Sequence, residues 1–355
     1  MSGVQTIAVT DAEDGLRLDR WFRAHFPALT HGRLEKLLRT GQVRVDGGRV
    51  KANTRLEPGQ MVRVPPLDVA PGGTAAGVLQ PRARAVNEAD RRFLKDLILH
   101  EDEAVLVLNK PYGLAVQGGT GTTRHIDGML EAMRDDTGER PRLVHRLDRD
   151  TSGVLVLART RIAARALGDA FKARQSEKIY WGLVHGVPPL REGDIKAPLK
   201  KDMVPGEDEL GERIQVAKVN DKDARHALTR YATVFQAGQK ATWLALMPIT
   251  GRTHQLRVHC AHMDTPLVGD VKYGYGARRP PIGGVGEGLH LHAYSLTIDH
   301  PSGGVLSVHA PLSPHMRETW DLLGFSDDHW ANPFDTAPAL GHSQTKRRKG
   351  APRCG

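Results

Sequence analysis

The sequence predicts an α+β protein, and three observations support this fold class. Between residues 178 and 258, several short apolar runs alternate with turn residues, so strands dominate. Residues 161–175 carry apolar side chains at helical spacing. Helices are thus interspersed among strands without the regular alternation of a doubly wound fold. A segment rich in Pro, Gly and Ala near residues 66–88 divides the chain into a small and a large part.

The first 66 residues are expected to form a small basic module. They hold 11 Lys and Arg against 7 Asp and Glu, which gives 11 − 7 = +4. Apolar residues at positions 16–22 begin an amphipathic helix. A second helix is expected over His31–Arg39, with Thr30 as its N-cap and Gly41 at its end. A strand over Gln42–Val45 and a hairpin turn at Asp46-Gly47 follow.

On the second helix, the leucines share one face and the basic residues lie away from it. The basic surface is either an ordinary solvated face or a helix–hairpin surface that contacts phosphates. The segments 17–22, 31–47 and 56–64 resemble the S4 RNA-binding domain. This resemblance implies a small α/β RNA-binding module. Its candidate RNA-docking residues are Arg33, Lys36, Arg39 and Arg44.

The larger part is expected to extend from residue 89 to residue 325. A linker over residues 67–88 precedes it, and a basic tail over residues 326–355 follows it. A short buried strand is expected over Ala104–Leu108. Further strands are expected over Tyr180–Val184, Arg230–Phe235, Thr242–Met247 and Leu289–Ile298.

Composition indicates a cytoplasmic protein with an anionic partner. The net charge is +9, which favours nucleic acid first and an anionic membrane surface second. No apolar run approaches the roughly 20 residues that a membrane-spanning helix needs. The first 15 residues lack the apolar core of a signal peptide. Cys260 and Cys354 lie far apart, so a disulfide framework is not expected.

Motifs for nucleotides and metals are not found. The glycines of 118–123 lack the following Lys-Ser/Thr of a P-loop, and those of 283–288 lack dinucleotide-binding spacing. His254, His259 and His262 invite a metal site, but no carboxylate or cysteine stands at ligand spacing. Because this region is expected to be a strand, the three histidines should point in different directions. We therefore expect no metal and no cofactor.

The segment HRLDRDTSG, residues 145–153, is the strongest candidate site. It places two arginines around Asp148, directly before the apolar run of residues 154–157. Charged groups at the mouth of a buried strand are costly unless they are paired. The segment is therefore expected to belong to a site rather than to a solvated loop.

Two further polar clusters, around Tyr180 and Arg257, could converge on Asp148. Each cluster alone is explained as well by a salt bridge or a satisfied buried polar group. Together they fit one cleft, in which Arg257 favours the ionised form of Asp148. A carboxylate can act as a nucleophile or stabilise a sugar cation, and a tyrosine ring can stack on a base. Only Asp150 could serve as a second carboxylate, which fits an ordinary glycosidase poorly.

Five segments resemble the RluA-type pseudouridine synthases. They are 107–119, HRLDRDTSG with the VLVLART that follows it, 248–259, 266–274 and 289–301. The resemblance covers residues 90–320 in order. It implies a catalytic domain built on a mixed, mainly antiparallel β-sheet with flanking helices. It also implies isomerisation of specific uridines in 23S ribosomal RNA, after base flipping and without a cofactor.

The resemblance also implies a role for individual residues. Asp148 is the catalytic aspartate, Tyr180 stacks on the base and can take its C5 proton, and Arg257 is the basic residue paired with the aspartate. Arg146 fills the gap that the flipped nucleotide leaves, and Leu256 packs against the base or the core. His145 and Arg252 are further candidates for substrate binding. Asp150 is expected to shape the turn.

Partners and alternatives follow from the same resemblance. The expected partner is 23S ribosomal RNA or a large-subunit precursor, bound by a monomer that contacts no membrane and no nucleotide cofactor. A non-catalytic RNA-binding protein is the first alternative, although the intact set of Asp148, Tyr180 and Arg257 disfavours it. A hydrolase of small nucleosides is the second, and the basic N-terminal module disfavours it.

Overall fold

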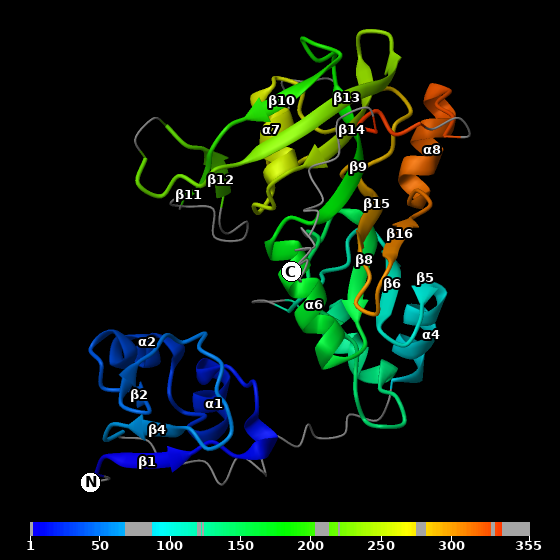
Figure 1. Cartoon of the computed structure of the whole chain (residues 1–355). Helices are drawn as coiled ribbons and strands as arrows, with labels where there is room; N and C mark the ends of the chain where they lie inside the picture. The colour runs from blue at the N-terminus through cyan, green and yellow to red at the C-terminus, as the bar shows by residue number, and fades with distance from the viewer. Residues whose placement is uncertain are drawn as a thin grey trace, which may run out of the picture. The chain divides into compact units, whose positions relative to one another are not determined.

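The computed structural model describes residues 3–67, 87–118, 122, 124–202, 213–218, 221–274, 282–327 and 331–335. The chain divides into two compact units, residues 1–86 and 87–355 (Figure 1). Most of the expected linker and most of the expected tail lie outside the described residues. The domain boundaries given above therefore stay predictions.

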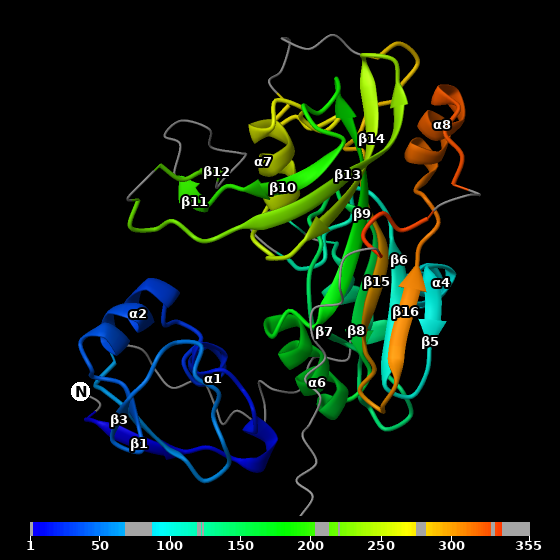
Figure 2. The ribbon, with the colours of Figure 1, turned by 45° about the horizontal axis from the view of Figure 1, so that its top comes forward.

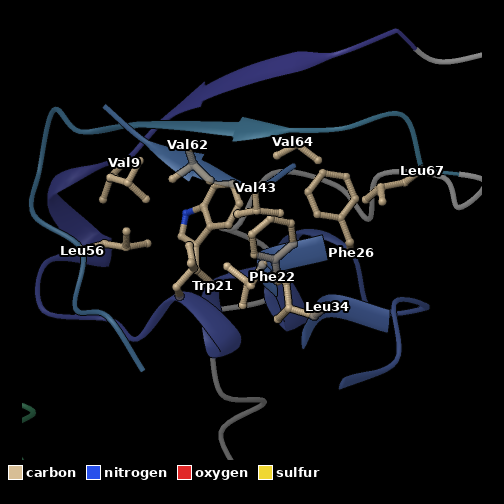
Figure 3. Close-up of a cluster of buried hydrophobic side chains, with 13 residues drawn as sticks. Val9, Trp21, Phe22, Phe26, Leu34, Val43, Leu56, Val62, Val64 and Leu67 are labelled. Atoms are coloured by element: carbon tan, nitrogen blue, oxygen red, sulfur yellow. The ribbon is translucent and has the colours of Figure 1, made fainter. Parts of the chain in front are cut away.

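The N-terminal unit is a small antiparallel sheet with helices against it. The strands run in the order β1 (Gln5–Ala8), β4 (Met61–Val64), β2 (Arg44–Val45) and β3 (Gly48–Arg49). A 3₁₀ turn, η1 (Asp11–Glu13), precedes the helices α1 (Leu18–His25) and α2 (His31–Arg39). Trp21 and Phe22 of α1 pack with Leu34 of α2 against Val62 and Val64 of the sheet (Figure 3).

The local signals of this unit have direct structural consequences. Asp46 and Gly47 both have positive φ angles, 48° and 76°. A tight hairpin of type I′ needs this at both central positions, so the predicted turn between β2 and β3 is confirmed. Thr30 precedes α2 in extended conformation, as an N-cap residue does. Leu34 and Leu38 are buried, so the predicted apolar face of α2 is confirmed as well.

The larger unit is built on a ten-stranded sheet among the described residues. The strands along it are β10 (Glu192–Lys196), β13 (Leu228–Ala237), β14 (Ala241–Pro248), β9 (Ser176–His185), β15 (Leu291–Asp299), β8 (Ser152–Ala158), β6 (Val105–Lys110) and β5 (Ile98–Glu101). β16 (Val305–His309) pairs with β15, and β7 (Arg142–Leu143) pairs with β8. Among the described strands of this sheet, only β15 and β8 pair in parallel, so the prediction of a mixed, mainly antiparallel sheet is confirmed.

Helices flank this sheet (Figures 1 and 2). They are α4 (Glu88–Asp96), α5 (Ile126–Met129), α6 (Arg161–Lys172), α7 (Gln255–His262) and α8 (Pro314–Leu323), with a 3₁₀ turn η2 (Leu130–Met133) after α5. β11 (Leu199–Asp202) and β12 (Arg213–Val216) pair antiparallel in a separate two-stranded sheet. The packing of α8 places Trp320 against Trp243 of β14, with ring centroids 5.3 Å apart.

The wholly apolar run of β8 has a clear cause. Val154 and Val156 pack with Leu167 of α6 in one cluster, whereas Leu155 and Leu157 pack with residues of α4 and α5 in another. Successive side chains of a strand point to opposite faces. Helices therefore cover both faces of β8, which removes the polar alternation that a half-exposed strand shows.

The prediction of a strand around residues 252–259 is wrong. Residues 255–262 form the helix α7, and residues 255–261 are all buried. The buried residues of α7 include polar Gln255, Arg257 and His259 between apolar neighbours, so its sequence lacks the apolar stripe that identifies an amphipathic helix. His259 and His262 belong to this one helix, where His259 is buried and His262 is exposed.

Candidate active site

A cavity of about 540 Å³ opens in the larger unit between the loop that precedes β8, the strand β9 and the helix α7. The seven residues predicted to be catalytic or to bind substrate all line it: His145, Arg146, Asp148, Tyr180, Arg252, Leu256 and Arg257. The structure therefore brings together side chains from three separate segments of the sequence. The four candidate RNA-docking residues belong to the N-terminal unit, where all are exposed on α2 or β2.

Lys110 anchors the loop that carries Asp148. This lysine is fully buried at the end of β6, and its Nζ donates to the carbonyl oxygens of Pro111, Leu114 and Arg149 at 2.8 to 2.9 Å. An ammonium group has three donors, and each meets one acceptor here. Burial lowers the pKa of Lys110 to about 7, against the opposing effect of Asp150 and Asp148. Sequence reasoning missed Lys110, because the chain gives no sign that it is buried.

The start of β8 is fixed by close pairing with β15, which runs parallel to it. Gly153 has a φ of 107°, and a Cβ at this position would lie 2.2 Å from the carbonyl oxygen of Ala293. Only glycine fits both requirements. Ser152 Oγ lies 2.8 Å from Nδ1 of buried His292, and burial lowers the pKa of His292 to about 4. The turn after Asp148 is thus held by tight backbone packing and a neutral imidazole.

His145 supports the same loop. Its Nε2 accepts a hydrogen bond of 2.8 Å from the backbone N–H of Val156 in β8. Burial, with the nearby charge of Lys178, lowers the pKa of His145 to about 3. A neutral ring is required, since an imidazolium nitrogen could not accept this bond. His145 lines the cavity, but its Nε2 is occupied by the hydrogen bond that fixes the loop before β8.

Arg257 forms an ion pair with Asp270. Its Nε and Nη2 lie 2.8 and 2.7 Å from the two oxygens of Asp270, and the side chains are only 6% and 0% exposed. Asp270 also accepts the backbone N–H groups of Lys272 and Tyr273 at 3.0 Å. Arg257 therefore forms its ion pair with Asp270 and not, as expected, with Asp148, with which it interacts only through its charge. Asp270 belongs to the segment 266–274, for which the sequence predicted a family resemblance but no site residue.

Asp148 lies partly exposed at the cavity, with its backbone oxygen bonded to the N–H of Thr151. The imidazole of His254 is within ion-pair range, because its Nε2 lies 3.9 Å from Oδ2 of Asp148. Asp150, the other carboxylate of the segment, points to Arg149, with Nε to Oδ1 at 3.1 Å. Only one carboxylate of this loop therefore lines the cavity.

Tyr180 enters the cavity from β9. Burial and then the negative charge of Asp148 raise the pKa of its phenol. The phenol therefore stays protonated at neutral pH. Lys178 lies two residues earlier on the same face of the strand and also lines the cavity. Its Nζ stands 5.6 Å from the ring centroid of Phe171, and burial lowers its pKa.

The remaining predicted residues differ in exposure. Arg146 is exposed at the rim. Leu256 is buried and packs with residues of β14 and β15 in a core cluster, so it contributes to the wall. Arg252 is exposed, and its Nε donates to the carbonyl oxygen of His226 at 3.1 Å. The cavity therefore has a buried apolar wall at Leu256 and exposed arginines, Arg146 and Arg252, at its opening.

Within the described part of the chain, no cluster of three or more His, Cys, Asp or Glu side chains could hold a metal ion. The described helices also include none that is long and apolar enough to span a membrane.

Comparisons with known proteins give a consistent result. The family model described as RNA pseudouridylate synthase matches residues 104–262. The chain is 37% identical to ribosomal large subunit pseudouridine synthase C of Yersinia pestis, over 88% of this chain and 94% of that one. It is also 37% identical to the mitochondrial RNA pseudouridine synthase 4 of Arabidopsis thaliana, over 84% of this chain and 69% of that one. The solved structure of human RNA pseudouridylate synthase domain containing 4 is 29% identical, with a TM-score of 0.56, and covers 67% of this chain and 97% of that one.

Proposed function

Since this chain belongs to the RluA-type RNA pseudouridine synthases, we propose that it isomerises specific uridines of 23S ribosomal RNA to pseudouridine. The observation that carries the proposal is the convergence of Asp148, Tyr180 and Arg257 on one cavity. Its volume of about 540 Å³ lies within the usual range for a small-molecule site, roughly 300 to 1,000 Å³. The names of the bacterial relatives, which specify the ribosomal large subunit, support this class of RNA.

In the proposed reaction, Asp148 supplies the carboxylate that assists cleavage of the bond between C1′ and N1 of the uridine, as a nucleophile at C1′ or by stabilising the sugar cation. The freed uracil rotates, and a C1′–C5 bond forms. C5 loses a proton and N1 gains one, so product and substrate are isomers. The raised pKa of Tyr180 favours stacking on the base over removal of the C5 proton, because the phenol would have to be ionised to act as a base.

The charge of the cavity supports an RNA substrate over a free nucleoside. The cationic side chains that line it are Arg146, Lys172, Arg174, Lys178, Arg252 and Arg257, whereas Asp148 is the acidic one. Asp270 neutralises Arg257, and Asp169 neutralises Lys172. The other four leave a surplus of positive charge at the mouth. Phosphates flanking a flipped uridine would meet this charge, and their binding would offset the cost of unstacking, a few kcal/mol.

We further propose that the N-terminal unit is an S4-like module that docks on the RNA away from the reacting base. Its exposed basic residues on α2 and β2, Arg33, Lys36, Arg39 and Arg44, are the proposed contacts. With large-subunit RNA or its precursor as the proposed substrate, we propose a monomeric enzyme that acts in the cytoplasm. No cofactor is proposed, because the isomerisation needs no external oxidant, reductant or group donor.

The test compares the wild-type protein with Asp148→Asn and Asp150→Asn on unmodified 23S RNA fragments, with pseudouridine mapped at single-base resolution. Asp148→Asn should reduce the rate by at least about 10²-fold. Asp150→Asn is the matched control, because it changes a neighbouring carboxylate that points to Arg149, and it should stay within a few-fold of wild type. Undiminished conversion by Asp148→Asn would refute the assignment. Binding without conversion by the wild type would favour the non-catalytic alternative.

A further inference from the structure

His254 is held in a backbone conformation that few non-glycine residues adopt. Its φ of 52° and ψ of 20° lie in the left-handed region, at the N-cap position of α7. Its side chain makes no capping hydrogen bond to the helix. Non-glycine residues in this region are disfavoured and persist where the surrounding structure or the function requires them. The requirement should therefore concern the imidazole itself, which lines the cavity.

The hydroxyl of Tyr273 is the hydrogen-bond partner of this imidazole. Nδ1 of His254 lies 2.8 Å from the hydroxyl oxygen of Tyr273. That oxygen also accepts the backbone N–H of Ile214 at 3.1 Å. When the hydroxyl of Tyr273 donates to Nδ1 of His254, the ring carries its own proton on Nε2, which is the tautomer that can donate to Asp148.

The other ring nitrogen, Nε2, faces the carboxylate of Asp148. The distance from Nε2 of His254 to Oδ2 of Asp148 is 3.9 Å, slightly longer than a hydrogen bond. Catalytic hydrogen bonds are often long in the free enzyme and shorten when substrate binds. Tyr273 is itself fixed, because its N–H is bonded to Asp270 and its ring lies 5.1 Å from the guanidinium of Arg257.

The surroundings keep the imidazole neutral. Burial lowers the pKa of His254, and the positive charges of Arg257 and Lys272 act in the same direction. The carboxylates of Asp148 and Asp270 oppose them without reversing the shift. A neutral ring donates from one nitrogen only, so its orientation decides which group receives that hydrogen bond.

We propose that His254 is a positioning residue for Asp148: its Nε2–H, oriented through Tyr273, binds Oδ2 and fixes the carboxylate for reaction with the uridine. The proposal rests on the proposed function, in which Asp148 is catalytic. Hydrogen bonds join β12, the loop of Tyr273 and the start of α7, and the proposed contact of Nε2 with Oδ2 extends this series to the loop before β8. The left-handed backbone of His254 is what turns the ring toward this series.

The experiment uses the full chain and the variants His254→Gly, His254→Gln and Tyr273→Phe, assayed on unmodified 23S fragments. Glycine suits the left-handed backbone, so His254→Gly should remove the donor without loss of stability in urea. It should lower kcat about tenfold or more and leave KM unchanged. His254→Gln keeps an N–H donor on a longer side chain and should recover part of the loss. His262→Gln is the matched control on the exposed surface of α7 and should match wild type.

Tautomer state gives a second readout that does not depend on turnover. Nitrogen-15 NMR of the wild-type imidazole should show the proton on Nε2, and Tyr273→Phe should yield a mixture of tautomers. A proton on Nδ1 in the wild type would overturn the proposal. So would kcat values within twofold of wild type for both His254→Gly and Tyr273→Phe. Failure of the proposed function would differ from both, since the wild type itself would then convert no uridine.

Discussion

Replacing Asp270 with asparagine should destabilise the larger unit by about 3 to 5 kcal/mol, because it leaves the guanidinium of Arg257 buried without a counter-charge. The two side chains are 6% and 0% exposed and are joined at 2.7 and 2.8 Å. Two unit charges about 4 Å apart, at an effective dielectric constant near 20, attract by about 4 kcal/mol, which agrees with that range. Asparagine has the same shape, so a cavity adds nothing to this loss.

The measurement is the free energy of unfolding in urea, followed by tryptophan fluorescence. Asp327→Asn is the matched control, because Arg317 and Asp327 form the same two-pronged contact at 3.0 and 2.7 Å with side chains 39% and 28% exposed. Solvent screens that pair, so its loss should cost about 0 to 1 kcal/mol. Equal losses for the two variants would refute the reasoning that burial makes Asp270 important. Asp270→Asn should also lower kcat, because Arg257 lines the cavity and loses the partner that fixes its position.

Three further predictions concern RNA binding and pH. Lys178→Met should raise KM several-fold and reduce the salt dependence of RNA binding by about one counterion, whereas Arg165→Met, exposed on α6, should change neither. The folded pKa of His292, about 4, lies below its unfolded value near 6.5, so the unfolded chain binds the extra proton and stability falls as pH drops through this interval. His292→Gln should reduce that slope by up to about 1.4 kcal/mol per pH unit. Replacing the three basic residues of α2 with alanine should raise KM at constant kcat; a fall in kcat alone would contradict the docking role.

The sequence by itself determined the fold class and the composition of the site. The run of apolar residues after HRLDRDTSG predicts a buried strand that is directly preceded by charged groups. β8 and the loop before it have this arrangement. The dipeptide Asp46-Gly47 determines its turn, since two positive φ angles are required there. Local periodicity and residue type decide such features, so they can be read from neighbours in the chain.

The tertiary structure alone decided how the charged groups pair. Arg257 and Asp270 are 13 positions apart, and nothing in that interval indicates that Asp270, rather than Asp148, receives the guanidinium. The helix α7 was not predicted because buried polar residues interrupt its apolar ones, which removes the amphipathic pattern. His254 contacts Tyr273 and Asp148 only because three loops meet at one cavity. Pairing of charges depends on distance in space and on burial, and the order of residues along the chain specifies neither.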